Sequence, residues 1–131
     1  MRTVLGGCLC QSVGFEVDLP FTKFVRCHCS RCRGATGSAF AVNAYVLPPA
    51  FRWRRGQEHV ARFDLPEARS FSTSFCRCCG SPLPHHTRSG REVIIPAGSL
   101  LEDPGVSPTL DSCWSSRATW LSDACDSPKL E

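Results

Sequence analysis

Hydrophobic and polar residues alternate along several short runs of this chain, and turn residues separate the runs. Val13, Phe15, Val17 and Leu19 alternate with polar or small residues, which is the pattern of a half-buried β-strand, and Pro20 ends the run. Further strands are expected at residues 24–26, 38–47, 51–53, 59–63, 71–75 and 92–95. Many short strands with almost no helical period predict an all-β fold.

One short helical segment is expected among these strands. The sequence predicts a single turn of helix between Ser30 and Thr36, with Ser30 as its N-cap. Gly34 and Gly37 prevent a longer helix, because glycine weakens a helix interior and commonly ends one. The helix therefore adds one turn to an otherwise β-rich chain.

The length of 131 residues indicates one domain, residues 1–131, with a core from about residue 5 to about residue 120. Beyond Asp103 the periodicity is poor. We expect Trp114 and Trp120 to pack in this region, and the last few residues to fray. The net charge of +3 comes from scattered basic residues, so nucleic-acid binding is not expected, and anionic small ligands are weakly favoured.

Ten cysteines are the outstanding feature of the composition. A disulfide framework would need an oxidising compartment, and reduced core thiols are a second ordinary explanation. The residues after Met1 contain no apolar run long enough for a signal peptide, and no stretch approaches a membrane span. We therefore expect a cytoplasmic protein without membrane contact, in which clustered cysteines bind metal or carry out chemistry.

Two cysteine pairs predict one closed metal site. Cys8 and Cys10 are two residues apart, so an extended backbone points both sulfurs to one side. Cys76 and Cys79 have the spacing that wraps two sulfurs around a metal, and Gly80 permits the tight turn. Four cysteines form a complete tetrahedral shell, which is typical of a structural zinc site.

A third group, Cys27, Cys29 and Cys32, supplies three more sulfurs. Three protein ligands leave a fourth position for water or substrate, which is typical of a catalytic zinc. A thiolate-rich shell suits an incoming thiol, which zinc would hold as a thiolate. His28 could close this shell, but alternation on an extended segment points it away from Cys27 and Cys29, so an outward or supporting role is expected.

The remaining candidates carry weaker signals. Cys78 adjoins a predicted ligand and could replace Cys79, although Gly80 favours Cys79. Cys113 and Cys125 are expected to be incidental. Surface or core packing is the default for the other histidines, which are His59, His85 and His86. Arg31 and Arg33 flank the three-cysteine group and could pair with substrate carboxylates, although solvated arginines are more common.

These motifs resemble one known family. The segments 6–10, 27–37, 75–80, 93–100 and 117–120 are similar to the glutathione-dependent formaldehyde-activating enzyme family, which includes centromere protein V. The resemblance implies an all-β fold of the β-tent type, in which zinc ions staple small β-sheets together. It also implies two zinc ions per chain. One would be a structural zinc bound by Cys8, Cys10, Cys76 and Cys79, and the other would be a catalytic zinc bound by Cys27, Cys29 and Cys32. Two residues depart from the family pattern. Cys78 is an extra thiol between Cys76 and Cys79, and Asp111 stands where relatives often carry histidine.

The family's activity is formation of S-(hydroxymethyl)glutathione, classed as a carbon–sulfur lyase reaction. The resemblance therefore implies a zinc enzyme acting on a glutathione-like thiol and a small aldehyde. Two alternatives remain open, because fold and metal are retained more readily than substrate. One is a non-catalytic zinc-stabilised binding module, for which the only concentrated basic stretch is residues 52–55. The other is a zinc buffer or redox sensor whose cysteines oxidise under stress.

Overall fold

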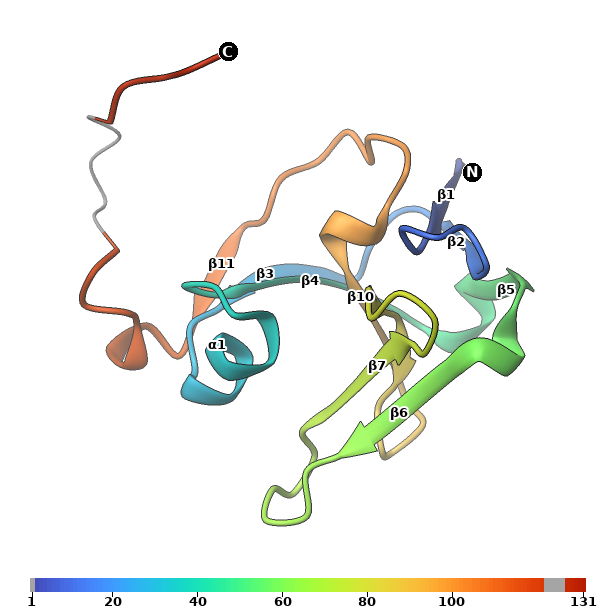
Figure 1. The fold of residues 1–131 in the computed structure, drawn as a ribbon, viewed down its shortest axis with the longest axis horizontal. Helices are drawn as coiled ribbons and strands as arrows, with labels where there is room; N and C mark the ends of the chain where they lie inside the picture. The colour runs from blue at the N-terminus through green and yellow to red at the C-terminus, as the bar shows by residue number, and fades with distance from the viewer. Residues whose placement is uncertain (1, 122–126) are drawn as a thin grey trace.

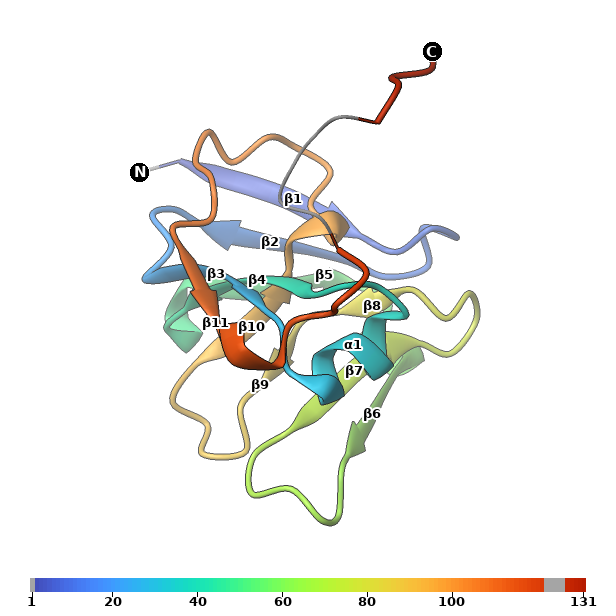
Figure 2. The same ribbon diagram turned by 90° about the vertical axis from the view of Figure 1, so that its left-hand side faces the viewer.

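The described chain is built from three small β-sheets, seen from two sides in the computed structural model (Figures 1 and 2). The structure describes residues 2–121 and 127–131. The prediction of an all-β fold is confirmed, with one α-helix and four short 3-10 helices among the described residues. None of the described helices is long and apolar enough to cross a membrane.

The first sheet contains three antiparallel strands in the order β1–β2–β5. Its strands are β1 (Thr3–Gly7), β2 (Gly14–Asp18) and β5 (Phe51–Arg55). Alternate residues of β2 are buried, as the hydrophobic alternation predicts, and Phe15 and Val17 are completely enclosed. Phe15 lies opposite Gly6 in the antiparallel ladder of β1 and β2. This pairing places the end of β1, and the loop that follows it, next to the core.

The second sheet has five strands in the order β11–β3–β4–β10–β9. These are β11 (Leu110–Ser112), β3 (Lys23–Cys27), β4 (Ala41–Val46), β10 (Val93–Pro96) and β9 (His85–His86). Only the β11–β3 pair is parallel among the described strands. Figure 2 shows β11, the last of the described strands in the sequence, lying beside β3. No sequence pattern predicted β11, because a three-residue strand is too short to show a period.

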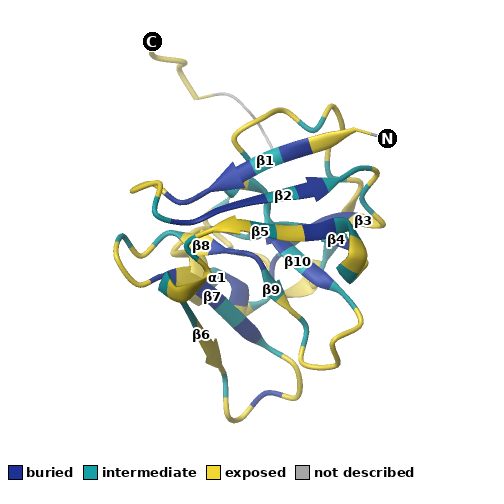
Figure 3. Cartoon of the chain, turned by 90° about the vertical axis from the view of Figure 1, so that its right-hand side faces the viewer, coloured by how far each residue is buried: buried dark blue, intermediate teal, exposed yellow. Residues whose placement is uncertain are grey.

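The third sheet has the order β6–β7–β8 and leads to the second cysteine pair. It contains β6 (Val60–Asp64), β7 (Ser72–Cys76) and β8 (Pro82–Leu83). The 3-10 helices are η1 (Pro48–Ala50), η2 (Gln57–His59), η3 (Ala97–Ser99) and η4 (Trp114–Ser116). Buried residues gather where the sheets face one another (Figure 3). The core is formed mainly by valines, phenylalanines, Leu83 and Ile95.

The helix α1 (Ser30–Thr36) lies where a helical turn was predicted, but its cap differs. Cys29, and not Ser30, is the N-cap, and its sulfur accepts a hydrogen bond from the Cys32 amide at 3.3 Å. Gly37 ends the helix with a φ of 66°, a backbone conformation that glycine adopts without strain. The capping atom is therefore the sulfur of a predicted metal ligand.

The expected packing of the C-terminal tryptophans is correct for one of the two. Trp114 places its ring edge-on against the His28 ring, with 5.0 Å between centroids. Trp120 is 70% exposed, so the expectation that it packs is wrong. Cys125 and part of the tail predicted to fray lie outside the described residues.

Candidate metal centres

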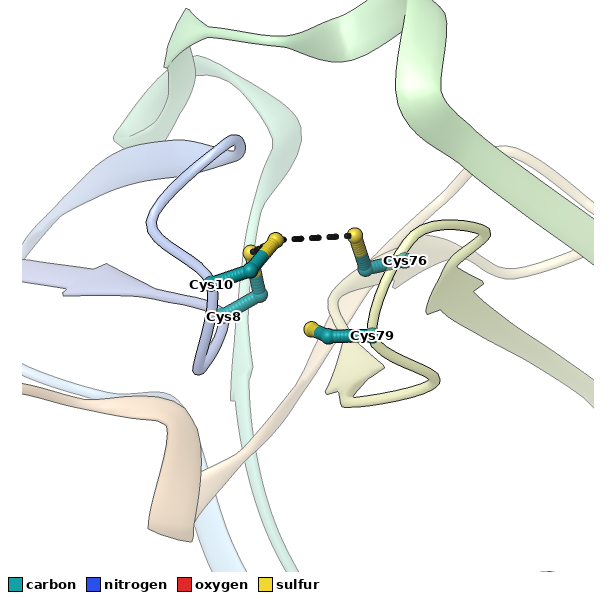
Figure 4. Close-up of side chains that lie close together, drawn as sticks. All are labelled: Cys8, Cys10, Cys76 and Cys79. Atoms are coloured by element: carbon teal, nitrogen blue, oxygen red, sulfur yellow. Dashed lines mark hydrogen bonds between the residues drawn. The ribbon is translucent and has the colours of Figure 1, made fainter.

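Four thiols from two distant loops meet in one cluster. The sulfurs of Cys8, Cys10, Cys76 and Cys79 all lie within 4.8 Å of one another (Figure 4). The Cys8–Cys10 and Cys10–Cys76 sulfur separations are 3.6 and 3.8 Å. A tetrahedral zinc with Zn–S bonds of about 2.3 Å requires sulfurs about 3.8 Å apart. The cluster therefore fits a tetrahedral thiolate-bound metal ion.

Backbone hydrogen bonds hold the two loops of this cluster in place. Gly80, with a φ of 76°, donates its amide hydrogen to the Cys76 carbonyl at 2.7 Å and closes the tight turn. Leu9 donates its amide hydrogen to the Ser81 hydroxyl at 3.1 Å, which joins the two loops directly. The four sulfurs are thus brought together by contacts made by the loops themselves.

The surroundings of these sulfurs favour negative charge at two of them. The Ser81 hydroxyl, 3.1 Å from the Cys79 sulfur, and backbone hydrogen bonds lower the pKa of Cys79 to about 5. A hydrogen bond with the Ser12 side chain lowers the pKa of Cys10, whereas burial raises the pKa of Cys8. Thiolates packed this closely repel one another, and a divalent cation relieves that repulsion.

The second cluster is local in sequence. Cys27 ends β3, Cys29 caps α1 and Cys32 lies in its first turn, and the three sulfurs lie within 4.8 Å of one another. Burial acts to raise the pKa of Cys27, but hydrogen bonds, led by that from the Ser112 side chain, lower it overall. Burial and the neighbouring Cys27 raise the pKa of Cys32. This group also fits a soft metal ion, with three ligands.

His28 lies between two members of this cluster but faces away from them. Its side chain is 2% exposed, and its Nε2 atom lies 2.8 Å from Asp111 Oδ1. Arg26 also donates to Asp111, and these two partners lower the pKa of Asp111 to about 2. His28 Nδ1 has no hydrogen-bond partner among the described residues. The predicted alternation of side chains is observed, but His28 is buried and not directed outward to solvent.

Two of the other cysteines lie close to the clusters. Cys113, expected to be incidental, interacts with the thiols of Cys27 and Cys29, which raise its pKa. No sequence spacing indicates this approach, because the parallel pairing of β11 with β3 creates it. Cys78 is exposed, with its sulfur 3.8 Å from His59 Nδ1.

A cavity of about 210 Å³ adjoins the three-cysteine cluster. Cys32, Thr36, Asn43, Phe71 and His85 are among the residues that line it. Burial lowers the pKa of His85 to about 4, so this side chain is neutral near pH 7. The Nε atom of Arg33 on α1 is buried and has no hydrogen-bond partner among the described residues. The volume of this cavity is larger than the volume of about 150 Å³ that is enough to bind benzene in an engineered protein cavity, so a small molecule fits beside Cys32.

The three small β-sheets and the two thiol clusters identify the chain as a cysteine-rich β-protein with two candidate metal centres. Within that class, this chain belongs to the glutathione-dependent formaldehyde-activating enzyme family, whose profile matches residues 3–117. The family resemblance noted from the sequence is therefore confirmed.

Among solved structures, the chain is similar to a Rhodobacter sphaeroides protein determined by crystallography. The two share 26% sequence identity with a TM-score of 0.64, and the match covers 82% of this chain and 99% of the other. No curated protein matches the chain. The likeness supports the fold and assigns no substrate.

Proposed function

We propose that this protein is a zinc-dependent enzyme of the carbon–sulfur lyase class that acts on a glutathione-like thiol and a small aldehyde. Family membership supports glutathione-related formaldehyde activation in general. The observation that carries the specific proposal is the three-sulfur group of Cys27, Cys29 and Cys32 beside a cavity. Three ligands leave a coordination position that an incoming thiol can take.

The two clusters would divide structural and catalytic work. Cys8, Cys10, Cys76 and Cys79 would hold a structural zinc ion, because four sulfurs complete the shell. Cys27, Cys29 and Cys32 would hold the catalytic zinc ion. When bound, this zinc supplies Lewis acidity that holds an incoming thiol as a thiolate. The proposal therefore requires two zinc ions in one domain spanning residues 1–131.

The residues around the second cluster would bind and orient the reactants. Arg33, which follows Cys32 on α1, would pair its guanidinium group with a carboxylate of the thiol. The cavity beside Cys32 can hold the aldehyde close to the sulfur and away from bulk water. The thiol sulfur then forms a bond to the carbonyl carbon, the π electrons move to oxygen, and that oxygen takes up a proton equivalent to the one the thiol loses. In the reverse direction the carbon–sulfur bond of the adduct breaks.

All nine described cysteines are free thiols. This is the state expected in a reducing compartment, and we include the cytoplasm in the proposal on that basis. The proposed partners are small molecules, and neither a membrane nor a nucleic acid is required.

The test is exchange NMR on zinc-loaded protein with glutathione and formaldehyde, after subtraction of the spontaneous reaction. We expect faster exchange between free and hydroxymethylated glutathione, and loss of that acceleration on Cys29→Ser. Cys78→Ser is the matched control, since Cys78 is an exposed thiol outside both clusters. An exchange rate equal to the spontaneous one in zinc-loaded wild-type protein would refute the enzyme proposal.

A thiol redox sensor or zinc buffer is the second candidate. The observation that favours it is the interaction of exposed Cys113 with Cys27, whose pKa is lowered overall by hydrogen bonds despite burial. A thiolate beside a second thiol is the usual arrangement of a redox-sensing pair. Hydrogen peroxide would then produce a disulfide and release zinc, with no acceleration of thiol–aldehyde exchange.

A further inference from the structure

The segment that carries Cys113 is held against the three-cysteine cluster on both sides. Ser112 pairs with Cys27 in the parallel ladder of β11 and β3, and the His28 amide donates to the Ser112 carbonyl at 3.0 Å. Trp114 packs its ring on His28 at a centroid distance of 5.0 Å. Cys113 lies between these two contacts, opposite the peptide that joins Cys27 to Cys29.

The backbone turns sharply at Cys113. Its φ is 55°, an uncommon conformation for a residue other than glycine, and its carbonyl accepts the Ser116 amide hydrogen at 2.9 Å as η4 begins. The Cys113 thiol is exposed and interacts with the thiols of Cys27 and Cys29. It lies outside the 4.8 Å group formed by the other three sulfurs, so it occupies the outer edge of the cluster.

Among the described residues, three side chains next to the cluster do not supply the fourth sulfur. His28 turns away and binds Asp111, and Arg31 and Arg33 are cations that cannot ligate a metal. A tetrahedral shell needs its fourth sulfur about 3.8 Å from the others. Cys113 lies in an exposed turn, and its thiol interacts with those of Cys27 and Cys29. We propose that Cys113 is the fourth sulfur ligand of the Cys27–Cys29–Cys32 centre and closes it in the absence of substrate.

The assignment of Cys113 as a ligand does not depend on the proposed function, but its role in the entry of a substrate thiol does. If a substrate thiol enters the centre, its sulfur would take the place of the Cys113 sulfur, so that four sulfurs would again surround the site. The Cys113 thiolate takes up the proton that the incoming thiol releases. The centre would then admit thiols in preference to water, because the resting shell contains no water ligand.

Cadmium-113 NMR of protein loaded with cadmium at both centres tests the inference, because the resonance position depends on the number of thiolate ligands. We expect two wild-type resonances, both in the range of four-thiolate sites. Cys113→Ser should move one resonance into the range of three sulfurs and one oxygen, and leave the other in place. Cys78→Ser, which removes a different exposed thiol, should move neither.

A wild-type spectrum with one resonance already in the three-sulfur range, and unmoved by Cys113→Ser, would overturn the inference. The wild-type spectrum decides this even if the variant folds poorly. Adding glutathione to cadmium-loaded Cys113→Ser separates the two proposals. Return of the shifted resonance to the four-sulfur range supports thiol entry. If the wild type shows two four-thiolate sites and glutathione has no effect on the variant, the Cys113 assignment stands and the proposed enzyme function fails.

Discussion

His28 and Asp111 form a hydrogen bond of 2.8 Å between Nε2 and Oδ1, beside the predicted catalytic cluster. Asp111 belongs to β11, and His28 follows β3, so the bond fastens the last strand to the peptide between Cys27 and Cys29. Arg26 donates two further hydrogen bonds to the same carboxylate. The position of Cys113 therefore depends on an interaction made by Asp111, two residues before it on β11.

Asp111→Ala should lower the free energy of unfolding by about 1–3 kcal/mol, because it leaves the buried His28 nitrogen without a partner. Urea unfolding of the zinc-loaded protein measures this change. Glu67→Ala, which removes an exposed carboxylate, should stay within about 0.5 kcal/mol of wild type. An equally small effect of Asp111→Ala would show that the bond contributes nothing to stability.

Cysteine substitutions should affect the two clusters differently. Cys76→Ser removes a fully buried sulfur that joins two distant loops, so we expect loss of the folded state, seen by circular dichroism. Cys29→Ser should keep the fold and lose one zinc ion of two, measured by atomic emission. Loss of both zinc ions on Cys29→Ser would contradict the independence of the centres.

His85 should make stability depend on pH. Burial lowers its pKa from 6.5 to about 4, so the unfolded chain binds the proton more readily. Its contribution is complete above pH 6.5 and is lost as the pH falls toward 4, by about 3 kcal/mol at most, since one pKa unit corresponds to about 1.4 kcal/mol.

The measurement is the difference in unfolding free energy between wild type and His85→Gln from pH 7.5 to 4. Both proteins lose metal in acid, and the contribution of that loss to the unfolding free energy cancels in the difference. The wild type should lose stability more steeply than the variant in this range. Parallel curves would contradict the lowered pKa.

Gly6 is required by the ring of Phe15. The two residues are cross-strand partners, and a Cβ atom at position 6 would collide with that ring, which is fully buried. Gly6→Ala should therefore cost about 1–3 kcal/mol through overpacking, measured by chemical denaturation. Gly98→Ala is the control, since a Cβ atom there meets no atom within 4 Å. Equal effects of the two substitutions would disprove the steric explanation.

Local patterns predicted most of the strands correctly. The alternation around Phe15 and Val17 identified β2, and the β-rich runs identified β4, β7 and β10. The position of α1 was also predicted correctly, although Gly34 lies inside the helix and only Gly37 ends it. Ser30 was wrongly expected as its cap, because a cysteine sulfur rarely replaces an oxygen in that role.

Cysteine spacing also predicted which thiols come together within each motif, because ligand spacing is local. The pairing of Cys8 and Cys10 with Cys76 and Cys79 followed from counting sulfurs, and the cluster is present. The environment of the second cluster could not be predicted in this way. The contacts of Asp111 and Cys113 depend on a parallel pairing between strands more than eighty residues apart, for which the chain carries no local signal.

The sulfurs of the two clusters emerge in a set order as the chain leaves the ribosome. Cys27, Cys29 and Cys32 are complete once a six-residue stretch has emerged, whereas Cys10 and Cys76 are 66 residues apart. Closing the longer loop has a greater entropic cost, and domains begin folding from the N-terminal end during synthesis. The newly made chain can therefore gather the three sulfurs of the local group first, complete the long-range centre once Cys79 has emerged, and add the proposed fourth ligand, Cys113, last.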